Sequence, residues 1–377
     1  MLDPARQDLM RRVHRVVVKI GTSLLTAGAG GVRRSMIERL ARQTSRLRET
    51  GREVIMVTSG AIGAGLEPLG YGKRPKTLPS LQACAAVGQT QLMRIYEATF
   101  RCFGIPVGQV LLTRDGLHDR KRYLNARNTL HALVDRGAVP IVNENDTVSV
   151  DEIRFGDNDL LSALVTDLAE AELLVILTDV PGFMTADPRT HQAARLIDTV
   201  EEITDDLAAA ATVGGTFLGT GGMVSKIEAG RMVNRSGELM VIAGGDERNV
   251  LVRILEGRTV GTLFVPRRGR LQSRKRWIAF GRRGKGVVTV DEGARRALAE
   301  RGKSLLASGV VGVSGRFDAG DGVTVRTASG DEIARGLSNY SAEDIGRIKG
   351  RKTSEIESIL GRKDFDEVIH RDNLVVF

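Results

Sequence analysis

The sequence predicts an α/β protein: a three-layer αβα sandwich with a mainly parallel central sheet, followed by a small C-terminal β-barrel-like domain. Two observations support this fold class. Between residue 13 and about residue 265, short apolar runs alternate with segments of helical periodicity, which is typical of a parallel sheet covered by helices. From about residue 286 onward, short apolar runs are separated by Gly and Asp turns, which favours a small β domain.

The first region contains the predicted sheet and its covering helices. Ile37, Leu40, Ala41, Thr44 and Leu47 follow the i, i+3, i+4, i+7 spacing of an amphipathic helix, which ends at Gly51. We expect strands at 13–20, 54–57, 107–112, 139–142, 173–177 and 239–242, with further helices at about 80–103, 122–134, from 160 and after 223. A hairpin is expected through 148–155.

The second region is predicted to be a separate domain. We expect short strands at 287–290, 310–313, 323–325 and 333–337, one helix at 292–301, and a helical tail at 342–360. The expected domain bounds are therefore 1–265 for the large domain, 266–285 for a basic linker, and 286–377 for the small domain with its tail. A length of 377 residues suits one large and one small domain.

The composition excludes several classes of protein. Hydrophobic residues make up 42% of the chain, and no segment approaches the roughly 20 consecutive apolar residues of a membrane helix. The first 15 residues are charged throughout and lack the apolar centre of a signal peptide. Cys84 and Cys102 are the only cysteines, so no disulfide framework is expected. We expect a soluble, cytoplasmic protein.

The net charge of +9 is concentrated in one segment. Nine basic and no acidic residues lie between positions 267 and 290: Arg267, Arg268, Arg270, Arg274, Lys275, Arg276, Arg282, Arg283 and Lys285. Of the 55 basic residues, the other 46 balance the 46 acidic ones. Such a run is typical either of a solvated linker or of a polyanion-binding patch.

Two lysines carry the strongest functional signal. Lys19 ends the first strand and is followed by Gly21-Thr22-Ser23, a turn whose backbone can approach a phosphate. Lys226 ends the run Thr220-Gly221-Gly222-Met223-Val224-Ser225, which opens a helix, so free N–H groups and a positive charge occur together. A surface lysine and simple N-cap chemistry are the alternatives. Neither GxxxxGK[ST] nor GxGxxG is present, so a nucleotide would need another scaffold.

Further polar residues follow the predicted strands, at the edge where open α/β sheets bind ligands. Asp146, Asp157 and Asp159 are candidates for holding the two lysines, a Mg²⁺ ion or a substrate amine, although turns also use Asp for backbone hydrogen bonds. Their spacing does not assign these roles. Ser59 could donate a hydrogen bond to a substrate carboxylate; a nucleophile elbow is excluded, because Gly-x-Ser-x-Gly is absent there. No histidine pairs with Ser or Cys, which argues against hydrolase chemistry.

Together these segments resemble the glutamate 5-kinase family of the amino acid kinase superfamily over essentially the whole chain. The matching segments, in the same order, are 17–23, 57–62, 143–146, 156–159, 178–179, 185–189 and 219–226. Sister kinases usually place two glycines after the first lysine, whereas this chain has one. Ser225 departs from the expected Thr but keeps the hydroxyl. The C-terminal region resembles a PUA domain, a fold known elsewhere for RNA binding.

The resemblance implies ATP- and Mg²⁺-dependent phosphorylation of the L-glutamate side-chain carboxylate, in the first step of proline biosynthesis. It assigns catalysis to Lys19 and Lys226, with Asp157 organising both. By position, the glutamate-binding residues would be Ser59, Asn143, Asp146 and Asn158, and the ATP-binding residues Lys19, Thr178, Asp179, Thr220, Gly221, Gly222, Met223, Val224, Ser225 and Lys226. Asp159 is the candidate metal ligand.

Feedback inhibition by proline and assembly into a homo-oligomer are also implied by the resemblance. Two alternatives stay open at this point. One is a related kinase that acts on a different carboxylate, such as aspartate or acetylglutamate. The other is an RNA-binding protein whose basic segment and C-terminal domain are the working parts. No membrane partner is expected.

Overall fold

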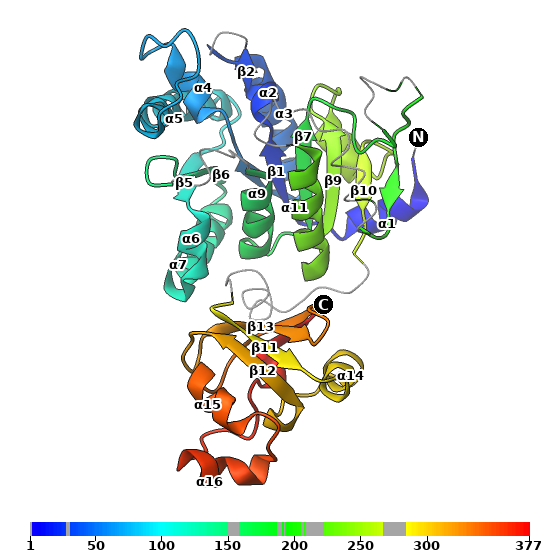
Figure 1. The fold of residues 1–377 in the computed structure, drawn as a ribbon. Helices are drawn as coiled ribbons and strands as arrows, with labels where there is room; N and C mark the ends of the chain where they lie inside the picture. Colours follow the sequence, from blue (N-terminus) through cyan, green and yellow to red (C-terminus); the bar gives the residue numbers. More distant parts are fainter. Residues whose placement is uncertain are drawn as a thin grey trace. The chain divides into compact units, whose positions relative to one another are not determined.

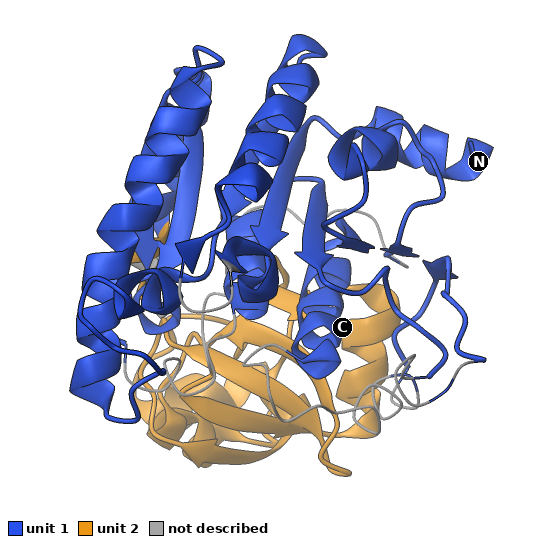
Figure 2. Ribbon diagram, turned by 90° about the horizontal axis from the view of Figure 1, so that it is seen from above, with its two compact units in different colours: residues 1–116, 124–270 blue, residues 117–123, 271–377 orange. Residues whose placement is uncertain are grey.

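A computed structural model of the chain describes residues 2–27, 31–149, 158–186, 191, 193–204, 207, 222–266 and 284–377. It divides into two compact units, coloured separately in Figure 2. Unit 1 contains residues 1–116 and 124–270, and unit 2 contains residues 117–123 and 271–377. Each unit is described below by itself.

Unit 1 is built on an eight-stranded sheet with the order β5-β6-β4-β1-β7-β9-β10-β8 (Figure 1). The strands are β1 Arg15–Ile20, β4 Glu53–Val57, β5 Val107–Leu112, β6 Val139–Glu144, β7 Leu173–Thr178, β8 Thr199–Val200, β9 Leu239–Gly244 and β10 Thr262–Phe264. The six strands from β5 to β9 are parallel, and β10 pairs antiparallel with β9. This confirms the predicted mainly parallel sheet.

The central strands are buried on both faces. Val16, Val17 and Val18 of β1 are all fully inaccessible to solvent, and every residue of β7 is buried. Continuous aliphatic runs of this kind are characteristic of strands with helices on both sides, because neither face of the sheet contacts water. The register places Lys19 of β1 between Val57 of β4 and Ile176 of β7, in the middle of the sheet.

Helices cover both faces of the sheet. Side chains of α1 Pro4–Arg11, α3 Arg34–Glu49, α5 Leu78–Arg101 and α12 Val250–Leu255 pack with one face in a single hydrophobic core. The opposite face is covered by α7 Arg120–Asp135, α9 Asn158–Leu168 and α11 Met223–Ser236, which lie in front of the sheet in Figure 1. These are the three layers expected from the sequence.

Short helices and one small hairpin follow the carboxyl ends of β1, β4 and β5. After β1 the chain forms α2 Thr22–Leu25 and the small hairpin of β2 Thr26–Ala27 with β3 Gly31–Val32. After β4 it forms α4 Ala61–Leu66, which packs against α5. A further short helix, α6 Arg114–His118, follows β5. The hairpin predicted through 148–155 falls mostly outside the described residues, which end at 149 and resume at 158.

Several elements differ from the expectation. Helix α9 begins at Asn158 and not at Leu160, so Asn158 and Asp159 lie in its first turn. The short elements α1, α12, β8 and β10 were not predicted, because two- to eight-residue segments carry little periodicity. Helix α1 did have a local signal, since Asp3 caps it through the N–H groups of Ala5 and Arg6 and Pro4 occupies its first turn.

Unit 2 contains a five-stranded sheet with the order β12-β11-β13-β14-β15. Its elements are β11 Gly286–Val290, α14 Glu292–Arg301, η1 Ala307–Gly309, β12 Val310–Gly315, β13 Gly322–Thr327, β14 Glu332–Leu337, α15 Ala342–Ile348, η2 Thr353–Glu355, α16 Ile356–Leu360, η3 Arg371–Asn373 and β15 Leu374–Val376. The predicted strands and the helix at 292–301 are confirmed. The expected helical tail is two short helices, and β15 was missed.

Among the described residues, no helix combines the length and the apolar character that crossing a membrane requires.

The close approach of α4 and α5 depends on glycine. A Cβ added to Gly88 of α5 would lie 1.8 Å from the carbonyl oxygen of Ala61, and one added to Gly65 of α4 would lie 1.9 Å from that of Cys84. Backbone atoms cannot yield as a flexible side chain can, so the two helices touch only because these positions lack side chains.

We therefore expect Gly88→Ala to lower the free energy of unfolding by about 1–3 kcal/mol, because the methyl group forces α4 and α5 apart. The measurement is urea unfolding followed by circular dichroism. Gly72→Ala is the matched control, since a Cβ there meets nothing within 4 Å, and it should change stability by less than about 0.5 kcal/mol. Equal stabilities of the two variants would contradict the packing described here.

Candidate functional site

The candidate site lies at the carboxyl edge of the parallel sheet. Lys19 is near the end of β1, Ser59 follows β4, Asn143 is near the end of β6, and Thr178 ends β7. Because these strands are parallel, their carboxyl ends share one edge of the sheet. Helices α9 and α11 add their first turns, which carry Asp159 and Lys226.

Asp159 lies between the two lysines that the sequence singled out. Its Oδ1 is 2.5 Å from Lys19 Nζ, and its Oδ2 is 3.0 Å from Lys226 Nζ. All three side chains are buried: Asp159 is 0% exposed, and Lys19 and Lys226 are each 5% exposed. Two ammonium groups about two hundred residues apart in the sequence are thus held by one carboxylate.

This arrangement keeps Asp159 ionised. Burial by itself would raise the pKa of the carboxyl, but the charges of Lys19 and Lys226, and the hydrogen bonds from both, outweigh burial and hold the pKa far below its ordinary value. Counted over these three side chains alone, two ammonium groups and one carboxylate give a net charge of +1. A buried net positive charge at a sheet edge is suited to an anionic ligand, because little water is present to screen it.

The first turn of α11 adds a hydroxyl to the cluster. Ser225 Oγ is 2.9 Å from Asp159 Oδ2 and 2.8 Å from the carbonyl oxygen of Gly222. A hydroxyl donor at this position therefore contacts the same carboxylate as Lys226. The departure from Thr to Ser leaves that contact in place, since only a methyl group is removed.

A second polar group, built from side-chain amides, lies beside the lysine cluster. Asn158 Nδ2 is 2.5 Å from the carbonyl oxygen of Thr58, 2.8 Å from Asn143 Oδ1 and 3.3 Å from Ser59 Oγ. Asn143 Nδ2 in turn donates to Gln89 Oε1 over 2.8 Å. We call Gln89, Asn143, Asn158 and Ser59 the amide chain. It connects three predicted glutamate-binding residues to helix α5.

Local backbone geometry presents Ser59 at this point. The next residue, Gly60, has φ of +92° and precedes α4. Only glycine adopts such a conformation without strain, so the Ser59-Gly60 turn depends on its sequence. Thr58 is fully buried, and its hydroxyl hydrogen-bonds to that of Tyr96 on α5. This hydrogen bond connects the turn to helix α5.

The other predicted site residues lie at the end of β7, on the turn after β6, or outside the described residues. At the end of β7, Thr178 is buried, and its hydroxyl donates to Asp179 Oδ1 over 3.0 Å. Asp146 lies on the turn after β6 and lines a cavity of about 630 Å³ together with Gln89 and Glu144. Asp157, Thr220 and Gly221 lie outside the described residues.

The structure places Asp159 between the two lysines, whereas the sequence alone makes it the candidate metal ligand. Asp157, to which the resemblance assigned the organising role, lies outside the described residues, so that assignment stays a prediction. In the described structure both oxygens of Asp159 face ammonium groups, which repel a cation. The described residues also contain no group of three or more His, Cys, Asp or Glu side chains placed to hold a metal ion.

Gln89 is a residue of the site that the sequence analysis missed. It lies on α5, is 8% exposed, and its side chain reaches Asn143. A signal was present: Ala85, Gln89, Leu92 and Tyr96 follow helical spacing and are all buried, so a glutamine occupies a position where the pattern calls for an apolar residue. Buried amides of this kind nearly always have hydrogen-bond partners.

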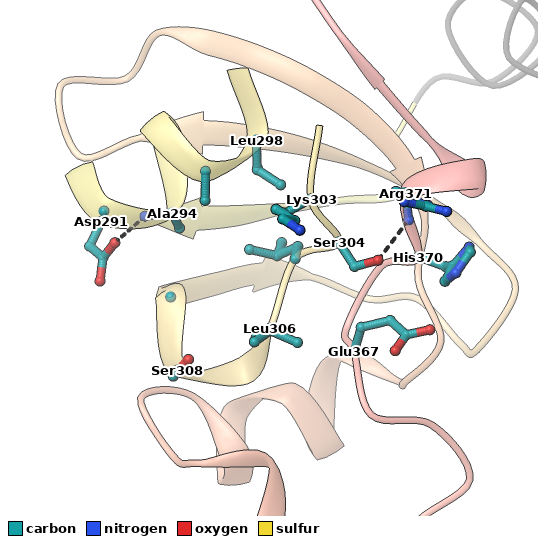
Figure 3. Close-up of a pocket in the computed structure, with 14 residues that line it drawn as sticks. Asp291, Ala294, Leu298, Lys303, Ser304, Leu306, Ser308, Glu367, His370 and Arg371 are labelled. Carbon is teal, nitrogen blue, oxygen red and sulfur yellow. Dashed lines mark hydrogen bonds between the residues drawn. The ribbon is translucent and has the colours of Figure 1, made fainter. Parts of the chain in front are cut away.

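Unit 2 has a cavity of its own, with a volume of about 740 Å³ (Figure 3). It is lined by residues that include Ala294, Leu298, Lys303, Leu306, Glu367 and Arg371. In Figure 3, Lys303, His370 and Arg371 lie toward one end, where Ser304 Oγ accepts a hydrogen bond from the Arg371 backbone N–H. The basic residues 267–276, 282 and 283 lie outside the described residues, so both interpretations of that segment remain predictions.

The lowered pKa of Asp159 leads to a prediction about acid stability. A carboxyl whose pKa is depressed by folding stabilises the protein above its unfolded pKa, about 3.9, and this contribution is lost as the pH falls further. Asp159→Asn removes the titrating group. We therefore expect the unfolding free energy of the variant to fall less steeply below about pH 4, by up to about 1.4 kcal/mol per pH unit.

Urea unfolding of the wild type and of Asp159→Asn at several values between pH 5 and pH 2.5 checks this. Asp8→Asn is the control, because the Asp8 side chain is 61% exposed on α1 and paired only at the surface. Identical slopes for the wild type and Asp159→Asn would show that Asp159 does not titrate as a buried, paired carboxylate.

Comparison with known proteins identifies the family to which the chain belongs. Residues 14–244 match the amino acid kinase family and residues 286–360 match the PUA domain. The chain is 53% identical over 362 residues to a glutamate 5-kinase of Caldanaerobacter subterraneus subsp. tengcongensis, which covers 96% of this chain and 97% of that protein. It is 51% identical over 371 residues to that of Geobacter sulfurreducens, covering 98% and 100%. The chain therefore belongs to the amino acid kinase family, and within it to the glutamate 5-kinases.

Proposed function

We propose that the protein transfers the γ-phosphoryl group of ATP to the side-chain carboxylate of L-glutamate, giving L-glutamate 5-phosphate, the first step of proline biosynthesis. The observation that carries this proposal is the buried Lys19–Asp159–Lys226 cluster beside the amide chain. The relatives named above are glutamate 5-kinases over nearly their full length, which supports the choice of glutamate.

The proposed mechanism is electrostatic. A carboxylate is already a nucleophile at neutral pH, so no covalent intermediate with the protein is needed. The difficulty is that the anionic carboxylate must approach the anionic phosphoryl group. The positive charges of Lys19 and Lys226 reduce this repulsion, while Asp159 holds both ammonium groups in place. Because Asp159 contacts both ammonium groups, the protein itself, and not the substrate, orients them.

The amide chain is proposed to hold the amino acid substrate. Ser59 and Asn158 lie within one hydrogen-bonded group, and Asn158 immediately precedes Asp159 on α9. A substrate held by the amide chain would therefore reach the lysine cluster with its distal carboxylate. Asp146, on the turn after β6, is proposed to add a carboxylate for the substrate ammonium.

ATP is proposed to occupy the carboxyl ends of β7 and β9 and the first turn of α11. Thr178, Asp179 and residues 222–226 line this region, and Thr220 and Gly221 complete the segment by sequence. The described residues do not fit a Mg²⁺ site of their own, because Asp159 is committed to the lysines. We propose that the ion arrives with ATP, since Mg²⁺ is commonly bound through substrate phosphates and water.

Three further properties belong to the proposal. Inhibition by proline and assembly into a homo-oligomer follow from the resemblance to the family. A cytoplasmic location agrees with two cysteines that are both free thiols, Cys84 buried and Cys102 exposed.

The substrate is tested by an ATP- and Mg²⁺-dependent hydroxamate assay on L-glutamate, L-aspartate and N-acetyl-L-glutamate, with and without proline. We expect acyl phosphate with glutamate at a kcat/KM at least about a hundredfold above the others, because a buried polar site rejects a ligand that leaves its groups unpaired. Activity that is higher on aspartate or acetylglutamate would assign the protein to a related reaction. Unchanged activity with proline would remove the inhibitor from the proposal.

The role of Lys226 is tested by Lys226→Ala. We expect kcat to fall by about 10²–10³ while the glutamate KM changes by less than about threefold, because the charge acts mainly on the transition state. Lys349→Ala, at an exposed lysine of unit 2, should leave both constants unchanged. An unaltered kcat for Lys226→Ala would remove Lys226 from the catalytic machinery.

A further inference from the structure

We infer that Gln89 is a positioning residue that holds the amide chain in one hydrogen-bonding direction, so that Ser59 offers a donor and Asn158 an acceptor to an α-amino acid. The inference rests on the proposed function, because it concerns how the same site distinguishes an amino acid from other dicarboxylates. Gln89 is on α5 and contacts Asn143, one of the predicted glutamate-binding residues.

The direction of the amide chain follows from one backbone atom. The carbonyl oxygen of Thr58 can only accept a hydrogen bond, and it lies 2.5 Å from the Asn158 amide, so that end of Asn158 must be the NH₂ group. The same NH₂ group then donates to Asn143, which must present Oδ1. Asn143 therefore turns its own NH₂ toward Gln89, which must present Oε1. Reversing any member would place two donors or two acceptors in contact.

This direction determines what the site offers to a ligand. Thr58 and Asn143, at 2.5 and 2.8 Å, take the two hydrogens of the Asn158 NH₂ group, so the atom left for a ligand is Oδ1, which can only accept. Ser59 Oγ faces the same NH₂ group at 3.3 Å, so its own hydrogen points away from Asn158 and can be donated. An acceptor and a donor side by side match the ammonium and carboxylate groups of an α-amino acid.

Gln89 ends the amide chain on the α5 side, and one of its own polar atoms is left unpaired among the described residues. Its Oε1 is the acceptor for Asn143, which is only 2% exposed. The other end of the same amide, Nε2, is buried and has no hydrogen-bond acceptor among the described residues. A buried donor without an acceptor is unfavourable, so the orientation of this amide is decided at Oε1, where the NH₂ group of Asn143 requires an acceptor.

The test compares Gln89→Met, which keeps the size but removes the acceptor, with Gln89→Glu, which keeps an accepting oxygen. For Gln89→Met we expect the glutamate KM to rise about five- to tenfold, with the ATP KM and kcat changed by less than about twofold, because one neutral hydrogen bond is lost from the glutamate side. Gln89→Glu should recover most of that loss. Gln91→Met is the matched control two residues further along α5, and it should behave as the wild type.

Glutarate, which is glutamate without its α-ammonium group, provides the second readout. In the wild type, glutarate leaves Asn158 Oδ1 unpaired, so its KM should greatly exceed that of glutamate. In Gln89→Met the acceptor is no longer held, and the ratio of the two KM values should shrink by at least about threefold. A ratio of KM values does not depend on how much of the variant folds.

The outcomes separate the two proposals. A wild type that does not phosphorylate glutamate overturns the proposed function and this inference together. A wild type that does, with Gln89→Met indistinguishable from Gln91→Met in KM and in the glutarate ratio, overturns the role of Gln89 alone. An equal loss in Gln89→Met and Gln89→Glu also overturns it, because the accepting oxygen would then be irrelevant.

Discussion

The candidate site depends on one buried carboxylate. Asp159 is inaccessible to solvent, and its anionic form is stabilised above all by Lys19 and Lys226, which contact its two oxygens. The dependence is mutual, since two buried ammonium groups without a counter-charge would be costly. The three side chains come from β1, α9 and α11, so the ion pairs also connect the centre of the sheet to two of the helices that cover it.

Helix α9 joins the two halves of the site. Asn158 and Asp159 are consecutive residues in its first turn, about 100° apart around the helix axis, so their side chains leave it in different directions. Asn158 enters the amide chain and Asp159 enters the lysine cluster. If the protein acts as proposed, a single helical turn therefore sets the distance between the bound amino acid and the transferring phosphoryl group.

The sequence predicted the sheet and the two lysines because each carries a local signal. Aliphatic runs such as that of β7 identify buried strands, and a lysine beside glycines identifies a phosphate-binding turn. The partner of the lysines could not be chosen in this way. Asp157 and Asp159 are two residues apart and carry the same local signal, so only the folded structure shows that Asp159 contacts Lys19. The role of Gln89 was missed for a similar reason: its hydrogen-bond partner Asn143 is 54 residues away, so no local pattern links the two.

The position of β1 has a consequence for how the protein is made. This strand is translated first, yet its two neighbours in the sheet are β4 and β7, and β9, β10 and β8 extend the sheet beyond β7. About 160 residues after the end of β1 must be synthesised before this strand can pair on both sides, and Lys226 follows later still. Until then the valines of β1 present an unpaired apolar edge, so a nascent chain needs protection there. The aliphatic run that suits β1 to the centre of the finished sheet is thus the kind of edge that can pair wrongly in a growing chain.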